Sequence, residues 1–307
     1  MQIGLMVEGQ LGLNWQRWQT LLQAAEDFGY QYVFRSDHYV NPQPPDMDSL
    51  ELWVSLTYAA SHTKRIEFGP MVAPVTFRHP ALTARMAAQI DDLSGGRLVL
   101  GLGAGWNERE HHTYGIPFYD RKTRFEMLED ALEITTLLFD NPEPSYYSGK
   151  HFSLDEAVLL PRPERSGGPP ILIGGRGPKK TLPLAAKYAR EWNIFGTLDD
   201  FKTSSARLSE LLIEQGRKPE EVKRSLATQV VFGKDDAALH NKLSQNVAAS
   251  TDDLWLQGTT GGTVSELIER LSQWQQAGVE RLLLQWLDLD DLIGLETIAS
   301  DVLPHFQ

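Results

Sequence analysis

The sequence predicts a (β/α)8 barrel, because short apolar runs alternate with longer segments of helical periodicity along the whole chain. Strands that alternate with helices pair in parallel through right-handed crossovers. Eight strand–helix units favour closure into a barrel over an open doubly wound sheet. No Pro/Ser-rich linker divides the chain, so residues 1–307 are predicted to form a single domain.

The strands are placed at apolar runs that turn residues bound. They are residues 2–8, 31–35, 65–72, 97–103, 170–174, 192–195, 224–232 and 281–285. Helix ends are placed by capping signals: Asn14 begins the first helix, Gly29 ends it, and Pro80 lies in the first turn of the third. Thr263 and Glu266 form a capping box for a later helix.

Two insertions account for the residues beyond a minimal barrel. Residues 141–163 are predicted to form a small hairpin that crosses the C-terminal mouth of the barrel. Residues 234–262 are polar, and a helix followed by a mobile loop is predicted there.

Composition excludes several classes of function. The chain has 41 acidic and 29 basic residues, a net charge of −12, which argues against nucleic-acid and anionic-membrane partners. The absence of cysteine excludes disulfides, thiolate nucleophiles and iron–sulfur clusters. The first apolar run is too short for a signal peptide, and no run approaches the roughly 20 apolar residues of a membrane span. We therefore expect a cytoplasmic protein.

The strongest local signal is a glycine-rich turn after the fifth strand, where barrel enzymes place their chemistry. It consists of Gly174, Gly175, Arg176, Gly177 and Pro178, at the start of a predicted helix. Glycines allow an anion to approach the backbone, and a helix N-terminus favours phosphate. The turn therefore predicts a phosphate site, with an ordinary capped turn as the alternative. The cations Arg78, Arg176, Lys179 and Lys180 are candidates to bind the anionic groups.

A second glycine cluster, Gly101, Gly103 and Gly105, follows the fourth strand. Trp106 interrupts what would be a dinucleotide fingerprint, so the motif indicates either close backbone approach to a flat ring or simple strand packing.

Asp37 and His38 follow the second strand. Histidine is the usual proton shuttle near neutral pH, so the pair is a candidate acid/base, with a structural hydrogen-bonded pair as the alternative.

His111 and His112 are adjacent without ligand spacing, so no metal site is predicted. A Ser hydrolase is disfavoured because the Gly-x-Ser-x-Gly elbow is missing.

Taken together, these segments resemble the luciferase-like monooxygenase superfamily, and more closely its branch of coenzyme F420-dependent oxidoreductases. The resemblance runs from Ile3 to about Gln285. It rests on the segments Phe-Arg-Ser-Asp-His, Pro-Val-Thr-Phe-Arg-His-Pro, Leu-Ser-Gly-Gly-Arg and Gly-Leu-Gly-Ala-Gly-Trp-Asn-Glu-Arg-Glu-His, in that order, and on the phosphate turn (residues 34–38, 74–80, 93–97, 101–111 and 174–178).

The resemblance implies a deazaflavin or flavin ring in the barrel mouth, with a non-proline cis peptide at Met71–Val72 behind it. Asp37 and His38 match the family's catalytic pair, with His38 as the general acid/base. The cofactor-binding residues it implies are Met71, Val72, Thr76, Gly103, Ala104, Gly105, Trp106, Gly174, Gly175, Arg176, Gly177 and Pro178.

Trp106 departs from the deazaflavin-linked sugar-phosphate dehydrogenases of the family, which have glutamate there. A more apolar substrate is therefore expected. Glu108, Glu110 and His111 lie nearby, and the sequence leaves open which of them faces the cavity.

The predicted function is hydride transfer between coenzyme F420 and a small organic substrate. The alternatives are an FMN-dependent monooxygenase that uses O2, a non-catalytic flavin- or deazaflavin-binding protein and, from another class, a metal-dependent barrel hydrolase. The resemblance also implies a homodimer.

Overall fold

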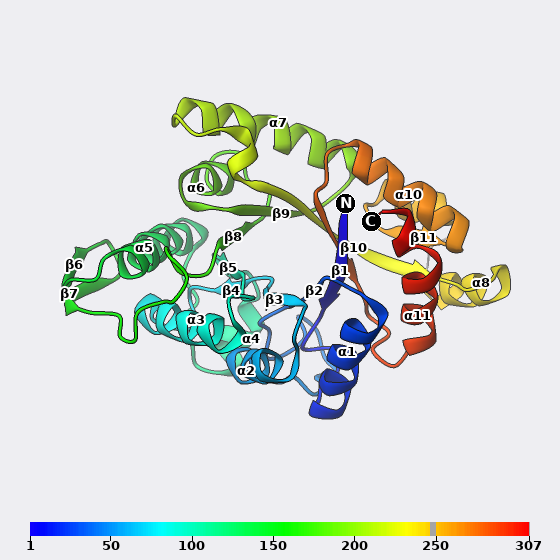
Figure 1. The fold of residues 1–307 in the computed structure, drawn as a ribbon, viewed down its shortest axis with the longest axis horizontal. Helices are drawn as coiled ribbons and strands as arrows, with labels where there is room; N and C mark the ends of the chain where they lie inside the picture. The colour runs from blue at the N-terminus through cyan, green and yellow to red at the C-terminus, as the bar shows by residue number, and fades with distance from the viewer. Residues whose placement is uncertain (246–249, 307) are drawn as a thin grey trace.

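The computed structural model describes residues 1–245 and 250–306, and its centre is a barrel of parallel strands (Figure 1). The barrel strands are β1 (Gln2–Val7), β2 (Tyr32–Arg35), β3 (Glu67–Pro70) with β4 (Ala73–Pro74), β5 (Leu100–Gly103), β8 (Ile171–Gly174), β9 (Glu191–Phe195), β10 (Lys223–Phe232) and β12 (Arg281–Gln285). Each of them overlaps a strand predicted from the sequence.

The strands join in a ring. Parallel pairing runs in the order β3-β2-β1-β12-β10-β9-β8-β5-β4, and an isolated bridge between Phe68 and Leu98 joins β3 to the segment before β5. β3 and β4 are consecutive in the chain, so they act as one strand interrupted at Met71 and Val72. The predicted (β/α)8 barrel is therefore confirmed.

Helices surround the ring (Figure 1). They are α1 (Trp15–Phe28), α2 (Leu52–His62), α3 (Pro80–Ser94), α4 (Glu108–Thr113), α5 (Arg121–Asp140), α6 (Thr181–Tyr188), α7 (Leu198–Glu214), α8 (Asp236–Gln245), α9 (Thr251–Leu256), α10 (Val264–Gln276) and α11 (Leu292–Asp301), with short 3-10 helices at Pro219–Glu221 and Leu303–His305.

The predicted helix ends are largely confirmed. Asn14 accepts a hydrogen bond from the Arg17 N–H, Gly29 ends α1 with φ 88°, and Thr263 forms its capping box with Glu266. One start differs: α6 begins at Thr181 rather than at Pro178, since residues 178–180 form a turn.

Two apolar layers hold the barrel together. Inward-facing side chains such as Met6, Phe34, Val99, Leu172 and Leu283 fill its interior. The larger layer lies between the strands and the helices and includes buried Trp18, Trp192 and Trp274. Because side chains alternate along a strand, each barrel strand contributes to both layers.

The predicted hairpin exists, but its predicted position is wrong. β6 (Ser145–Ser148) and β7 (Ser153–Ala157) pair antiparallel and lie against α5 on its side away from the barrel (Figure 1). The Tyr147 hydroxyl and the backbone N–H groups of His151 and Phe152 all donate to the Asp130 carboxylate on α5. These contacts direct the hairpin outward, away from the mouth.

The second insertion contains more structure than predicted. It forms α8, α9 and a short strand, β11 (Thr260–Gly262), which pairs with the last three residues of β10. A helix followed by a loop was predicted over residues 234–262, and residues 246–249 of that segment lie outside the described residues. Among the described helices, none is both long and apolar enough to cross a membrane.

Candidate active site

A cavity of about 1210 Å³ opens at the C-terminal ends of the strands, where the sequence places the candidate residues. Its size lies slightly above the usual range for small-molecule and cofactor sites. Twelve of its lining residues were named from the sequence as catalytic or cofactor-binding: His38, Met71, Val72, Gly103, Ala104, Gly105, Trp106, Gly174, Gly175, Arg176, Gly177 and Pro178.

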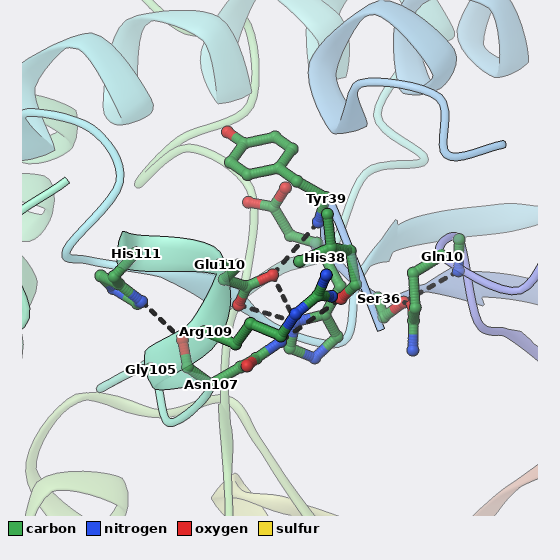
Figure 2. Close-up of polar contacts among 12 residues, drawn as sticks. Gln10, Ser36, His38, Tyr39, Gly105, Asn107, Arg109, Glu110 and His111 are labelled. Atoms are coloured by element: carbon green, nitrogen blue, oxygen red, sulfur yellow. Dashed lines mark hydrogen bonds and ion pairs between the residues drawn. The ribbon is translucent and has the colours of Figure 1, made fainter. Parts of the chain in front are cut away.

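His38 lies on this cavity and is held from behind by Glu110 of α4 (Figure 2). The His38 Nδ1 lies 2.9 Å and 3.1 Å from the two Glu110 carboxylate oxygens. Glu110 is 1% exposed, and its Oε2 also accepts the Tyr39 backbone N–H at 3.1 Å. Of the three α4 residues that were candidates to face the cavity, none lines it, and Glu110 reaches the site only through His38.

Two opposing effects act on the pKa of His38. Burial alone would lower it, but the hydrogen bond and negative charge of Glu110 outweigh burial and raise the pKa above its ordinary value. More distant negative charges on Glu8 and Asp37 act in the same direction. His38 is therefore prepared to carry a proton near neutral pH.

Asp37, named with His38 as catalytic, lies apart from the cavity. Its carboxylate is buried and bonded to the Arg78 guanidinium at 2.6 Å, and Arg78 also bonds Tyr39 and Glu51. Burial raises the Asp37 pKa, although Arg78 opposes the shift. This geometry fits a structural role for Asp37 rather than an acid/base role. Arg78, a candidate cation for the cofactor's anionic groups, is bonded to Asp37 and does not line the cavity.

Thr76 also lies outside the set of cavity-lining residues. Its hydroxyl is 2.8 Å from Nε2 of His111, a fully buried side chain of α4. Glu108, by contrast, points outward and pairs with His112 at 3.8 Å.

The peptide between Met71 and Val72 is cis, as the family resemblance implied. Val72 then projects toward the glycines of neighbouring strands. A Cβ on Gly103 would lie 2.4 Å from Val72 Cγ2, and one on Gly101 would lie 2.1 Å from the Pro70 carbonyl oxygen. Strand packing therefore requires these glycines, while Gly103 and Gly105 also line the cavity.

The glycine turn after β8 faces the cavity. Gly175 has φ 115°, which favours glycine, and its N–H donates to the Asn193 carbonyl. No side chain caps the first turn of α6, but the Leu182 N–H donates to the Gly177 carbonyl at 3.0 Å and Pro183 has no N–H, so few of its amides are left for an anion. Lys179 and Lys180, named as candidate cations, lie outside the lining, and Arg176 pairs with Asp200.

Sequence reasoning missed part of this wall. The residues it did not name include Arg121, Arg124 and Phe125 of α5, Asn193 and Phe195 of β9, and Thr203, Ser204 and Arg207 of α7. They come from β9 and from the helices α5 and α7, and only the barrel rule applied to whole strand–helix units would have indicated them. Together with Arg176 they place four arginines around the cavity.

These features fit a flavin-like or deazaflavin group. A glycine-lined wall at Gly103 and Gly105 leaves room for a flat ring, while the turn after β8 and the four arginines suit anionic groups. In residues 1–245 and 250–306, no group of three or more His, Asp or Glu side chains is placed to hold a metal ion.

The fold and the site together define a flavin- or deazaflavin-type barrel, and the comparisons agree. The family model described as luciferase-like monooxygenase matches residues 1–283, so the chain belongs to this family.

Individual relatives include enzymes named as F420-dependent and an enzyme named as a monooxygenase. The chain is 29% identical to the F420-dependent hydroxymycolic acid dehydrogenase of Mycobacterium tuberculosis, over 86% of this chain and 69% of that one. It is 25% identical to the 4-hydroxyprotoasukamycin monooxygenase of Streptomyces nodosus subsp. asukaensis, over 96% and 88%. The solved coenzyme F420-dependent tetrahydromethanopterin reductase of Methanopyrus kandleri superposes with a TM-score of 0.84 at 21% identity, over the full length of both chains.

Proposed function

We propose that the protein is an oxidoreductase that transfers a hydride between coenzyme F420 and a small organic substrate. The observation that carries this proposal is His38, held by Glu110, in the wall of the cavity that the glycine turn and the arginines also line. Relatives named as F420-dependent dehydrogenases support the same assignment. A bound deazaflavin would supply the redox chemistry, and the protein supplies binding, orientation and electrostatics.

His38 is the group that moves a proton. Its Nδ1 is occupied by Glu110, which leaves Nε2 for a ligand in the cavity. From Nε2 it donates a proton to a substrate atom that gains negative charge on hydride addition, or removes one in the reverse direction. Trp106 meets the His38 ring edge-on, with ring centroids 5.4 Å apart, and gives this side of the cavity an apolar surface.

The cofactor-binding role belongs to the rest of the cavity wall. Met71 and Val72 form the surface behind the ring, beside Gly103, Ala104 and Gly105. The turn at residues 174–178 and the arginines bind the anionic end of the cofactor.

The test is an absorbance titration of the purified protein with F420 and, separately, with FMN, followed by single-turnover assays with alcohol and ketone substrates under anaerobic conditions. We expect saturable F420 binding and anaerobic turnover. His38→Gln should retain F420 binding and lose turnover by about 100-fold or more. Tight FMN binding with product formation only in O2 would overturn the deazaflavin assignment.

An FMN-dependent monooxygenase is the second candidate, favoured by the relative named as a monooxygenase and by the apolar wall at Trp106. In that case the cavity would act chiefly by excluding water. F420 binding without any turnover would instead identify the third alternative, a non-catalytic binding protein.

The assembly proposed with this function is a homodimer that acts on a small molecule. Light scattering on the eluted chain measures its mass directly, and a mass of one chain would contradict the dimer.

A further inference from the structure

We infer that Glu110 is a positioning residue for the proposed reaction: through its contacts it fixes the ring orientation, tautomer and charge of His38, while α4 holds Glu110 in place. This inference rests on the proposed role of His38 as the proton-transfer group. Glu110 itself is almost fully buried and does not line the cavity, so it acts through His38.

The first step is the tautomer. An ionised carboxylate only accepts hydrogen bonds, so the His38 Nδ1 at 2.9 Å must carry the hydrogen. The cavity then meets Nε2, which accepts a proton when the ring is neutral and donates one when it is charged. The Tyr39 N–H is the second group on this carboxylate and directs its Oε2 toward the segment after β2.

The second step is the anchoring of α4 to the same segment. Asn107 Nδ2 donates to the Val40 carbonyl at 3.3 Å, and Arg109 donates to the Asn41 carbonyl at 2.7 Å. Arg109 also pairs with Asp46 at 2.6 Å. Both residues lie just before Glu110 in the sequence, so these contacts hold the start of α4 against the segment after β2 (Figure 2).

The third step is the residue next to Glu110. His111 is fully buried, and its Nδ1 lies 2.7 Å from the Asn107 carbonyl, which can only accept. In the neutral ring Nε2 therefore accepts the Thr76 hydroxyl at 2.8 Å. This bond ties α4 to the segment after β4, so two adjacent side chains of one short helix connect two strand ends of the mouth.

Other charges near His38 are already engaged. Glu8, directly after β1, accepts hydrogen bonds from Gln285 and Gln10, and Asp37 is bonded to Arg78. Within the described part of the chain, Glu110 is the carboxylate in hydrogen-bond contact with His38. Removal of the Glu110 charge should therefore change the pKa of His38 more than removal of the charge on Glu8 or Asp37.

The experiment is an NMR titration of the histidine side chains in the cofactor-free protein, with the His38 signal assigned from His38→Gln. In the native protein, neutral His38 should be the Nδ1–H tautomer. In Glu110→Gln the His38 pKa should fall by about 1 unit, and in Glu110→Asp by less. Glu108→Gln is the matched control, since this exposed side chain of α4 pairs with His112, and the His38 pKa should not move.

A neutral His38 found as the Nε2–H tautomer in the native protein would overturn the inference without any variant being needed. An unchanged His38 pKa in folded Glu110→Gln would also overturn it. Neither measurement requires turnover, so the proposed function is tested separately: a shifted pKa in a protein that transfers no hydride would refute the function and leave the positioning role intact. With turnover, the pH profile of kcat should move with the His38 pKa.

Discussion

Val72 and Gly103 share one small space between adjacent barrel strands, because a Cβ on Gly103 would lie 2.4 Å from Val72 Cγ2. Both residues also line the cavity. The packing of the barrel and the shape of the cofactor wall therefore depend on the same contact.

Gly103→Ala should destabilise the protein by about 1–3 kcal/mol through overpacking, and it should weaken F420 binding as Val72 is displaced. Urea unfolding and an absorbance titration measure the two effects. The double variant Val72→Ala/Gly103→Ala removes the obstructing methyl groups and should recover part of the stability. Equal losses in the single and double variants would contradict the proposed contact.

Arg121 of α5 is exposed on the cavity rim, where it adds positive charge to an acidic protein. Arg121→Gln should weaken F420 binding by roughly 3- to 10-fold, or about 1 kcal/mol, and the difference should shrink as salt is added. Lys64→Gln removes a charge before β3, at the opposite end of the barrel, and should leave the affinity unchanged. Equal effects of the two variants would show that only net charge matters.

Arg281 closes the end of the barrel opposite the cavity and has two acidic partners of different burial. Its guanidinium lies 2.9 Å from Glu191, which is 5% exposed, and 2.7 Å from Glu67, which is 42% exposed. Glu191→Gln should cost about 3 kcal/mol of stability because a buried charge loses its buried partner. Glu67→Gln should cost less than about 1 kcal/mol. Calorimetric or urea unfolding of both variants measures the two losses of stability. A larger loss in Glu67→Gln than in Glu191→Gln would refute the prediction.

Glu26 gives stability a dependence on pH. Its Oε1 accepts the backbone N–H groups of Lys64, Arg65 and Ile66 at 2.8–3.0 Å. Burial alone would raise the Glu26 pKa, but these three donors lower it overall. A carboxyl whose pKa is lower in the folded state stabilises the protein above its unfolded pKa, and this contribution is lost as pH falls through the folded value.

Glu26→Gln should therefore reduce stability by about 1 kcal/mol at pH 7, and the difference from the native protein should vanish toward pH 3. Urea unfolding at several pH values measures it. Asp27→Asn, a change to the exposed neighbouring residue, is the control. A difference that persisted at pH 3 would mean that hydrogen-bond geometry, rather than ionisation, explains the loss.

The barrel could be predicted from the sequence because its signals are local. Apolar runs mark the strands, and residues such as Asn14, Gly29 and Thr263 mark helix ends without reference to distant residues. The cis peptide at Met71–Val72 came from the family resemblance, since nothing in the local pattern distinguishes it.

Contacts between segments far apart in the chain were the part that could not be predicted. Glu110 and His38 are 72 residues apart, and only the folded barrel brings α4 beside the end of β2. The hydrogen bonds from Thr76 to His111 and from Arg78 to Asp37 could not be predicted either. The partner of a polar side chain depends on how the loops pack, and the sequence pattern does not show this. The hairpin position depends similarly on Asp130 of α5.

That outward placement of β6 and β7 has a practical side. A fluorophore or an affinity handle joined near Asp155 would stand clear of the ligand entrance, so immobilised or labelled preparations should keep their binding chemistry. The hairpin thereby offers an attachment point away from the cavity.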